Sequence, residues 1–217
     1  MEIEVLEGIF DANEIIAGEN REILDRHGVF MVNLMASPGA GKTSLILKTL
    51  EGVGGGLSCA VIEGDIAGKV DSERIAEQGV PAIQINTGGS CHLEAKQVNT
   101  ALKRMELEQV DLLIVENVGN LVCPAEFKLG EDLKVMILSV AEGHDKPLKY
   151  PLMFSESHVL IINKIDLIPH TDFDMESLKE TVRKMNPAVE IFEVSCRTGE
   201  GLSAWTGWLK GRVETSK

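Results

Sequence analysis

The sequence predicts an α/β protein with a mostly parallel, doubly wound sheet flanked by helices. The first observation is that short apolar runs alternate along the chain with longer segments of helical spacing. This alternation is typical of parallel sheets joined by crossover helices. The second is that several runs are apolar at successive positions, as in central strands whose two faces are both covered. Ligands are then expected at the carboxyl ends of the strands.

The elements follow in order. Residues 11–27 read as an amphipathic helix that ends at Gly28, which gives a helical extension over 1–28 and one α/β domain over 29–217. Strands are predicted over 29–36, 57–64, 80–86, 110–117, 133–140, 158–165 and 189–195. Helices are predicted over 42–52, 71–79, 92–106, 173–186 and 201–210. Long loops remain over 118–132 and 141–150, and long loops tend to be functional.

Composition narrows the classes of function. The 217 residues include 34 acidic and 21 basic side chains, a formal charge of −13, which disfavours binding to nucleic acid or to anionic membranes. No apolar run reaches the roughly 18 residues that a membrane span needs. The N-terminus lacks the pattern of a signal peptide, and the four cysteines then indicate a reducing compartment. We therefore expect a cytoplasmic protein.

A phosphate-binding loop follows the first predicted strand. The run ASPGAGKTS has the P-loop pattern, with Ala36 where the first glycine is usual. Its glycines let backbone amides turn toward the phosphates, Lys42 is the catalytic candidate that reaches the β- and γ-phosphates, and Thr43 can ligate Mg²⁺. The predicted nucleotide contacts are Ser37, Pro38, Gly39, Ala40, Gly41, Lys42, Thr43 and Ser44.

A second motif selects the base. The run NKID supplies Asn163, Lys164 and Asp166 at the end of a buried strand. The Asp166 carboxylate can accept from N1–H and the 2-amino group of guanine, whereas adenine would leave it unpaired at about 1–3 kcal/mol for each group. Ser195-Cys196-Arg197 resembles the last guanine-contacting loop of GTPases, with arginine in place of the usual lysine. GTP, converted to GDP, is therefore the predicted nucleotide.

Acidic side chains that follow two other strands suit Mg²⁺. Asp65 and Glu116 end strands expected to flank the phosphate loop, and their carboxylates can hold Mg²⁺ directly or through water. Asp71 is the candidate for orienting or deprotonating the attacking water, although it also suits the first turn of a helix. The amide of Gly119 can approach the γ-phosphate. No glutamine occupies an obvious water-positioning place, so slow turnover is expected.

Soft ligands follow two further strands. Cys91 and His92 are expected to open a helix, whose N-terminus favours a thiolate, and Cys123 lies in the loop after ENVGN. If the loops of neighbouring strands bring them together, two thiolates and an imidazole suit Ni²⁺ or Zn²⁺ better than Mg²⁺. The alternative, a capping Cys-His pair with an unrelated loop cysteine, stays equally open on this chemistry alone.

The motifs also carry a resemblance. ASPGAGKTS, EGDIAGKVDSER, NTGGSCHLEA, ENVGNLVCPAEFKLGE, DKPLKYP and NKIDL occur in the order seen in the hydrogenase nickel-incorporation GTPases, the HypB family. The resemblance implies a SIMIBI-class P-loop fold, a GTP-dependent homodimer, and nickel delivery to a [NiFe]-hydrogenase precursor with HypA as partner. It also implies that Cys91, His92 and Cys123 are metal ligands. The Cys-rich or His-rich N-terminal segments of some members are absent here.

Three alternatives remain. The urease nickel GTPases share the fold class, but their pattern has a Cys-Pro-His triplet where this chain has CH. A metal-independent nucleotide switch that recruits a partner is a second alternative, and a small-molecule kinase, which would prefer ATP, is a third.

Overall fold

One parallel sheet organises the chain in a computed structural model that describes residues 8–65, 75 and 77–216. Within these residues the sheet has seven strands in the order β3-β2-β4-β1-β5-β6-β7. The strands are β1 (Phe30–Ala36), β2 (Cys59–Asp65), β3 (Ala82–Asn86), β4 (Leu112–Glu116), β5 (Leu133–Ser139), β6 (Val159–Asn163) and β7 (Glu190–Glu193). Every predicted strand is found within two residues of its expected ends, and the prediction of a parallel, doubly wound sheet is confirmed.

Burial explains why the central runs are apolar at most positions. All residues of β1 are buried, with Phe30, Val32 and Leu34 on one face of the sheet and Met31 and Met35 on the other. Successive side chains of a strand point to opposite faces, so a strand covered on both sides is apolar on both faces, and the one polar residue of β1, Asn33, accepts a hydrogen bond from Asn117. The edge strands β3 and β7 are only partly buried, and their sequences include polar residues.

The helices predicted over 42–52, 92–106, 173–186 and 201–210 each have a counterpart in the structure, but the one predicted over 92–106 spans only residues 95–102. They are α1 (Gly8–His27), α2 (Lys42–Val53), α4 (Ala95–Leu102), α5 (Cys123–Glu126), α6 (Lys146–Lys149), α7 (Pro151–Ser155), α8 (Met175–Met185) and α9 (Leu202–Thr215). Three short 3-10 helices are η1 (Leu107–Gln109), η2 (Val140–Glu142) and η3 (Ile165–His170). The helix predicted over 71–79 falls mostly on residues outside the described part. The two predicted long loops contain α5 and α6, and a proline in the first turn begins each of these short helices.

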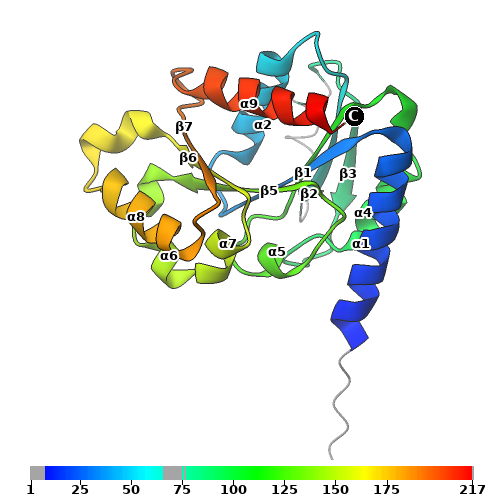
Figure 1. Cartoon of the computed structure of the whole chain (residues 1–217), viewed down its shortest axis with the longest axis horizontal. Helices are drawn as coiled ribbons and strands as arrows, with labels where there is room; N and C mark the ends of the chain where they lie inside the picture. The colour runs from blue at the N-terminus through cyan, green and yellow to red at the C-terminus, as the bar shows by residue number, and fades with distance from the viewer. Residues whose placement is uncertain (1–7, 66–74, 76, 217) are drawn as a thin grey trace, which may run out of the picture.

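Helices cover both faces of the sheet (Figure 1). Helices α2 and α9 pack together on one face, where Leu45 and Trp205 are fully buried. On the other face α1 lies beside α4, and α7 packs against α8 around Phe154. The three apolar clusters account for the core of the described residues, so the carboxyl ends of the strands are left to carry polar loops.

The N-terminal helix packs on the domain. Predicted over 11–27, α1 begins at Gly8 and ends at His27, and Gly28 follows with φ of 65°. Leu24 is fully buried on the α4 side of the sheet, whereas Ile15 of the same predicted apolar side is 66% exposed. The division of the chain into an extension over 1–28 and a domain over 29–217 stays a prediction.

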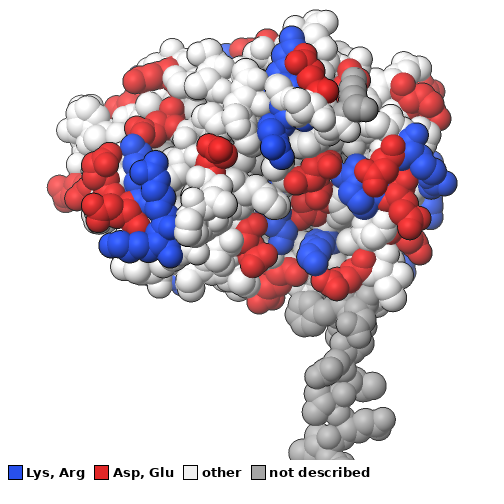
Figure 2. All heavy atoms as spheres, viewed as in Figure 1, with Lys and Arg blue, Asp and Glu red and all other residues white. Residues whose placement is uncertain are grey.

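The surface is strongly charged. Acidic and basic side chains are interspersed over the face drawn in Figure 2, in a chain whose formal charge is −13. Among the described helices, none joins the length and the apolar character that crossing a membrane requires.

Candidate functional site

The phosphate-binding loop connects β1, at the centre of the sheet, to α2. Gly39 and Gly41 have φ of 77° and 105°, backbone conformations that residues with a side chain rarely adopt. Gly41 directly precedes the first residue of α2. No side chain caps this N-terminus and no acidic residue lies in its first turn, so its amides stay available for an anion. Lys42, Thr43 and Ser44 form the first helical turn.

Glu116 faces this turn from the end of β4. The Thr43 hydroxyl oxygen lies 3.3 and 3.4 Å from the two Glu116 carboxylate oxygens, and the Lys42 ammonium lies 4.0 Å from one of them. The side chains of Lys42 and Glu116 are 10% and 8% exposed. A partly buried hydroxyl beside a buried carboxylate offers hard oxygen donors of the kind that Mg²⁺ prefers.

The other acidic candidates are only partly described. Asp65 is the last residue of β2, where its backbone pairs with Asn86. The strands expected to flank the phosphate loop do so unequally, because β4 is next to β1 whereas β2 lies one strand further out. Asp71 lies outside the described residues.

A cavity of about 310 Å³ adjoins the phosphate loop on the β6 side. It is lined by Gly41, Ser44, Asn163, Lys164, Asp166, Leu167, Cys196 and Arg197. The Asn163 amide donates to the Ala40 carbonyl (2.9 Å), and a Cβ at Gly41 would lie 2.5 Å from the amide nitrogen of Asn163. The Lys164 ammonium donates to the Gly39 carbonyl (2.7 Å), so the NKID loop and the phosphate loop are joined by two hydrogen bonds.

Asp166 is oriented by the neighbouring loop. The Ser195 hydroxyl donates to one Asp166 oxygen (2.6 Å), and the Arg197 guanidinium lies 3.8 Å from the other. Since the Arg197 side chain is 83% exposed, this ion pair contributes little. The Cys196 amide donates to the Asn163 side chain, and burial raises the pKa of the Cys196 thiol to about 11, so that thiol stays protonated. The sequence predicts that this loop contacts guanine, but it does not predict the hydrogen bond from Ser195 to Asp166.

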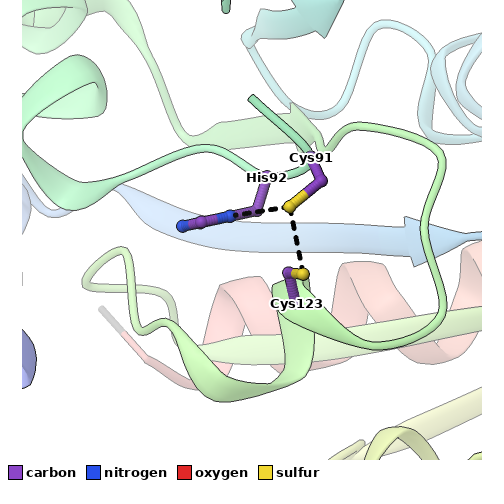
Figure 3. Close-up of side chains that lie close together, drawn as sticks. All are labelled: Cys91, His92 and Cys123. Carbon is purple, nitrogen blue, oxygen red and sulfur yellow. Dashed lines mark hydrogen bonds between the residues drawn. The ribbon is translucent and has the colours of Figure 1, made fainter. Parts of the chain in front are cut away.

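The soft ligands come together at the same edge of the sheet (Figure 3). The sulfur atoms of Cys91 and Cys123 are 3.0 Å apart, and the Cys91 sulfur is 3.5 Å from Nδ1 of His92. One ligand atom from each residue lies within 4.8 Å of the others. Two thiols and an imidazole in this arrangement fit a soft or borderline ion such as Ni²⁺ or Zn²⁺.

Two details of this arrangement differ from the sequence prediction. Cys91 and His92 do not open the helix, because the Glu94 capping box with Gln97 starts α4 at Ala95. The strands before the two ligand segments are not neighbours either, since β2 lies between β3 and β4. The first segment crosses the end of β2 above Gly64, where a Cβ would lie 2.6 Å from the Leu93 side chain.

The imidazole of His92 is held by an aromatic neighbour. Its ring stacks on Phe127 with centroids 3.9 Å apart and planes 25° apart. Within the described residues its Nε2 atom is buried and has no hydrogen-bond partner. Burial lowers the pKa of His92, against a smaller opposing effect of Glu94 and Glu126, so the ring is neutral and able to ligate at neutral pH. The hydrogen bond from Cys91 raises the pKa of Cys123.

The loop after β4 links the phosphate-binding loop to the cluster of Cys91, His92 and Cys123. After β4, the Asn117 side chain accepts from the Leu93 amide (3.0 Å), and the Asn120 side chain donates to the Cys91 carbonyl (3.3 Å). The backbone N–H of Asn120 donates to the Ala36 carbonyl (2.9 Å). A Cβ at Gly119 would lie 3.0 Å from Pro38. The two asparagines stand in the run ENVGN, and sequence reasoning gave neither of them a role.

A further contact fixes the start of the phosphate loop. The Ser37 hydroxyl forms a short hydrogen bond with the Glu142 carboxylate, whose other oxygen accepts from the Ser139 amide (2.8 Å). Glu142 therefore joins the phosphate loop to the turn after β5. Sequence reasoning did not single it out.

Comparison with known proteins gives consistent matches. Residues 30–193 match the family described as CobW/HypB/UreG, nucleotide-binding domain. The hydrogenase maturation factor HypB of Azotobacter vinelandii is 49% identical over 96% of this chain and 69% of its own length. A crystal structure of HypB from Helicobacter pylori in complex with nickel aligns with a TM-score of 0.89 at 38% identity, over 94% of this chain and 96% of that one. HypB from Archaeoglobus fulgidus aligns with a TM-score of 0.88 at 38% identity, covering 94% and 99%.

Proposed function

Because the chain belongs to the HypB group of the CobW/HypB/UreG nucleotide-binding family, we propose that it hydrolyses GTP while carrying nickel or zinc, and that it assists nickel insertion into [NiFe]-hydrogenase. The observation that carries the metal half is the convergence of Cys91, His92 and Cys123 beside a phosphate-binding loop. Relatives named hydrogenase maturation factors, one of them solved with nickel, support the choice of cargo.

The proposal that the chain binds GTP rests on the phosphate-binding loop and the NKID loop, which the side chains of Asn163 and Lys164 join. The amides at the N-terminus of α2 bind the phosphates, and Lys42 neutralises the charge that develops on the β- and γ-oxygens. Asp166 accepts from N1–H and the 2-amino group of guanine, and Ser195 holds its carboxylate in place. ATP lacks these two donors, so GTP is preferred.

Hydrolysis needs a divalent cation and an oriented water. Thr43 and Glu116 fit Mg²⁺, with Asp65 as a further candidate, and a bound Mg²⁺ supplies charge neutralisation at the leaving oxygen. Asp71 is proposed to orient the water. Without a water-positioning glutamine, turnover is expected to be slow.

The soft cluster suits transfer of an ion. Three ligands leave a coordination position that an acceptor or a second protomer can fill, and permanent structural sites usually have four protein ligands. We propose a GTP-dependent homodimer that meets at this face, with HypA and the hydrogenase precursor as partners in the cytoplasm. A neutral His92 and two deprotonated thiols would hold the cargo.

The decisive experiment is a calorimetric nickel titration of the protein loaded with GDP or with a non-hydrolysable GTP analogue, with the oligomeric state measured alongside. We expect stoichiometric nickel that is lost in Cys123→Ala and a dimer favoured by the GTP analogue. Nickel content unchanged in Cys123→Ala would instead favour a metal-independent switch. Binding of mantATP as tight as that of mantGTP would contradict the assignment of the base.

A further inference from the structure

Two asparagines on α1 form hydrogen bonds with the segments that contain or follow the metal ligands. Asn13 and Asn20 are seven residues apart, which places them on the same side of the helix two turns from each other. Asn20 is fully buried, and Asn13 is partly buried. A buried amide on a helix surface needs partners, because an unpaired polar group in the interior is costly.

Each asparagine bonds to the same two segments, which we name the Cys91 segment (residues 91–95) and the Cys123 segment (residues 123–129). The Asn13 side chain accepts from the Ala95 amide (2.9 Å) and donates to the Lys128 carbonyl (2.8 Å). The Asn20 side chain donates to the carbonyls of Ala95 (2.9 Å) and Leu129 (2.8 Å).

The Asn20 contacts are the stronger anchor. Its oxygen also accepts from Asn99 of α4 (2.8 Å), so both ends of the amide are satisfied in a fully buried position. By contrast, the Lys128–Glu14 ion pair that joins the same elements is more than half exposed on both sides, and such pairs contribute little. The asparagines therefore fix the separation of the two segments.

These anchors lie three to six residues after the ligands in the chain. Ala95 is three residues after His92, and Lys128 directly follows Phe127, whose ring stacks on His92. The stack joins the Cys91 segment to the Cys123 segment on the ligand side, and the asparagines join them on the α1 side. A shift of either segment would change the separation of the Cys91 and Cys123 sulfur atoms.

We propose that α1 sets the spacing of the metal ligands, with Asn13 and Asn20 as positioning residues that act through the backbones of the two segments. The proposal rests on the metal-carrying function proposed above. Residues that orient metal ligands typically change metal affinity by about 10- to 100-fold when removed. We expect about a tenfold loss of nickel affinity when one asparagine bridge is broken, at unchanged ligand identity.

Three variants separate positioning from general stability. Asn13→Asp keeps the acceptor for the Ala95 amide at the start of α4, where a carboxylate is favourable, but loses the donor to Lys128. Asn20→Ala removes both carbonyl contacts and is the more severe change. Asn186→Ala is the matched control, since the Asn186 amide bonds to the carbonyls of Phe154, Ser155 and Ser157, none of which belongs to either ligand segment.

Two measurements are made on each folded variant. The first is the nickel dissociation constant from chelator competition, with the thiolate-to-nickel absorption band recorded. The second needs no metal: the equilibrium between the Cys91–Cys123 disulfide and free thiols in a glutathione buffer, where each disulfide formed consumes one oxidised glutathione and yields two reduced ones. The linkage is identified by peptide mass, and its equilibrium constant reports how closely the two thiols are held.

We expect Asn13→Asp and Asn20→Ala to weaken nickel binding and to lower the disulfide equilibrium constant, and Asn186→Ala to change neither. Wild-type values of both quantities in a folded Asn13→Asp variant would overturn the proposal, as would an equal effect of Asn186→Ala. If Asn20→Ala does not fold, Asn13→Asp decides. A wild-type protein that binds no nickel, yet shows the expected order of disulfide constants, would refute the metal-carrying function and support the role of α1.

Discussion

The Ser195 hydroxyl donates a 2.6 Å hydrogen bond to the Asp166 carboxylate and so joins the two loops that line the proposed guanine cavity. Ser195 is fully buried, and its oxygen also accepts from the Thr198 amide (3.1 Å). The carboxylate proposed to select the base is therefore held by a buried residue that does not itself line this cavity.

Replacing Ser195 by alanine should weaken GTP binding without changing the preference for guanine. Loss of one hydrogen bond to a charged group corresponds to about 1.5–3 kcal/mol, or roughly 10- to 100-fold in affinity. Fluorescence titration with mantGDP measures this, with Ser216→Ala near the C-terminus as the control. Unchanged affinity in Ser195→Ala would show that Asp166 needs no support from this loop.

Nickel affinity should fall as the pH falls. The hydrogen bond from Cys91 raises the pKa of Cys123, so that thiol is protonated at neutral pH and must release its proton to the solvent when it ligates. Burial lowers the pKa of His92, so the imidazole is already neutral and adds no pH dependence at neutral pH. Cys123 therefore contributes up to about tenfold in affinity per pH unit below its pKa.

The measurement is nickel competition against a chelator of known proton dependence, from about pH 6.5 to about pH 8. The lower limit is the ordinary pKa of histidine, above which an imidazole is mostly neutral. The affinity should rise steadily through this range by up to about one power of ten per pH unit, because the raised pKa of Cys123 makes its proton compete with nickel. A flat profile would mean that Cys123 does not ligate as a thiolate.

The loop that contains Asn120 should couple the nucleotide to the metal. In the wild type, nickel affinity is expected to differ between the GDP-bound and GTP-analogue-bound protein, since allosteric coupling is typically about 5- to 150-fold. Asn120→Ala removes the contact to the Cys91 carbonyl but keeps the backbone contact to Ala36, so the ratio of the two affinities should move toward one.

The measurement is a nickel titration of the wild type and of Asn120→Ala, each loaded with GDP or with the GTP analogue. Asn186→Ala is the control for the loss of an asparagine that bonds to backbone carbonyls. A ratio that is the same in Asn120→Ala and in the wild type would exclude this contact as the link. Equal affinities in the wild type would exclude coupling itself.

Two glycines beside the guanine loop allow a sharp test of close packing. Gly199 and Gly201 have φ of 88° and 73°, but a Cβ at Gly199 meets nothing within 4 Å, whereas one at Gly201 would lie 1.9 Å from the Glu193 carbonyl oxygen. Gly199→Ala should cost about 1 kcal/mol of unfolding free energy through its backbone conformation alone. Gly201→Ala should cost at least about 2 kcal/mol more, as overpacking does.

Urea unfolding monitored by tryptophan fluorescence compares the two variants. Because Gly201 precedes α9 and follows the Ser195 loop, Gly201→Ala should also weaken GTP binding. Equal losses of stability in the two variants would show that the chain moves Glu193 away at little cost.

Much of the fold could be predicted because the strands are chemically distinct from their surroundings. Runs such as 133–140 are apolar at nearly every position, and only a strand covered on both faces needs that composition. Helix ends were harder to predict. The spacing of apolar residues in 92–106 continues through His92, whereas the capping box of Glu94 and Gln97 determines where α4 starts.

The site was predictable to the extent that its groups lie within single motifs. The phosphate loop and NKID each carry their chemistry in a few successive residues. The contacts made by Asn20, Asn120, Phe127 and Glu142 join segments far apart in the chain, and no local pattern reveals which amide or carboxylate will find which partner. The position of β2 between β3 and β4 in the sheet could likewise not be predicted from the sequence.

The docking of α1 has a consequence for synthesis on the ribosome. This helix is made before the segments that it packs on, and two of its anchors are the carbonyls of Lys128 and Leu129, which lie about a hundred residues later in the chain. A nascent chain therefore holds α1 without its full complement of partners until those later residues have been added. Although α1 is made before these partners, it is fixed in place only after they emerge.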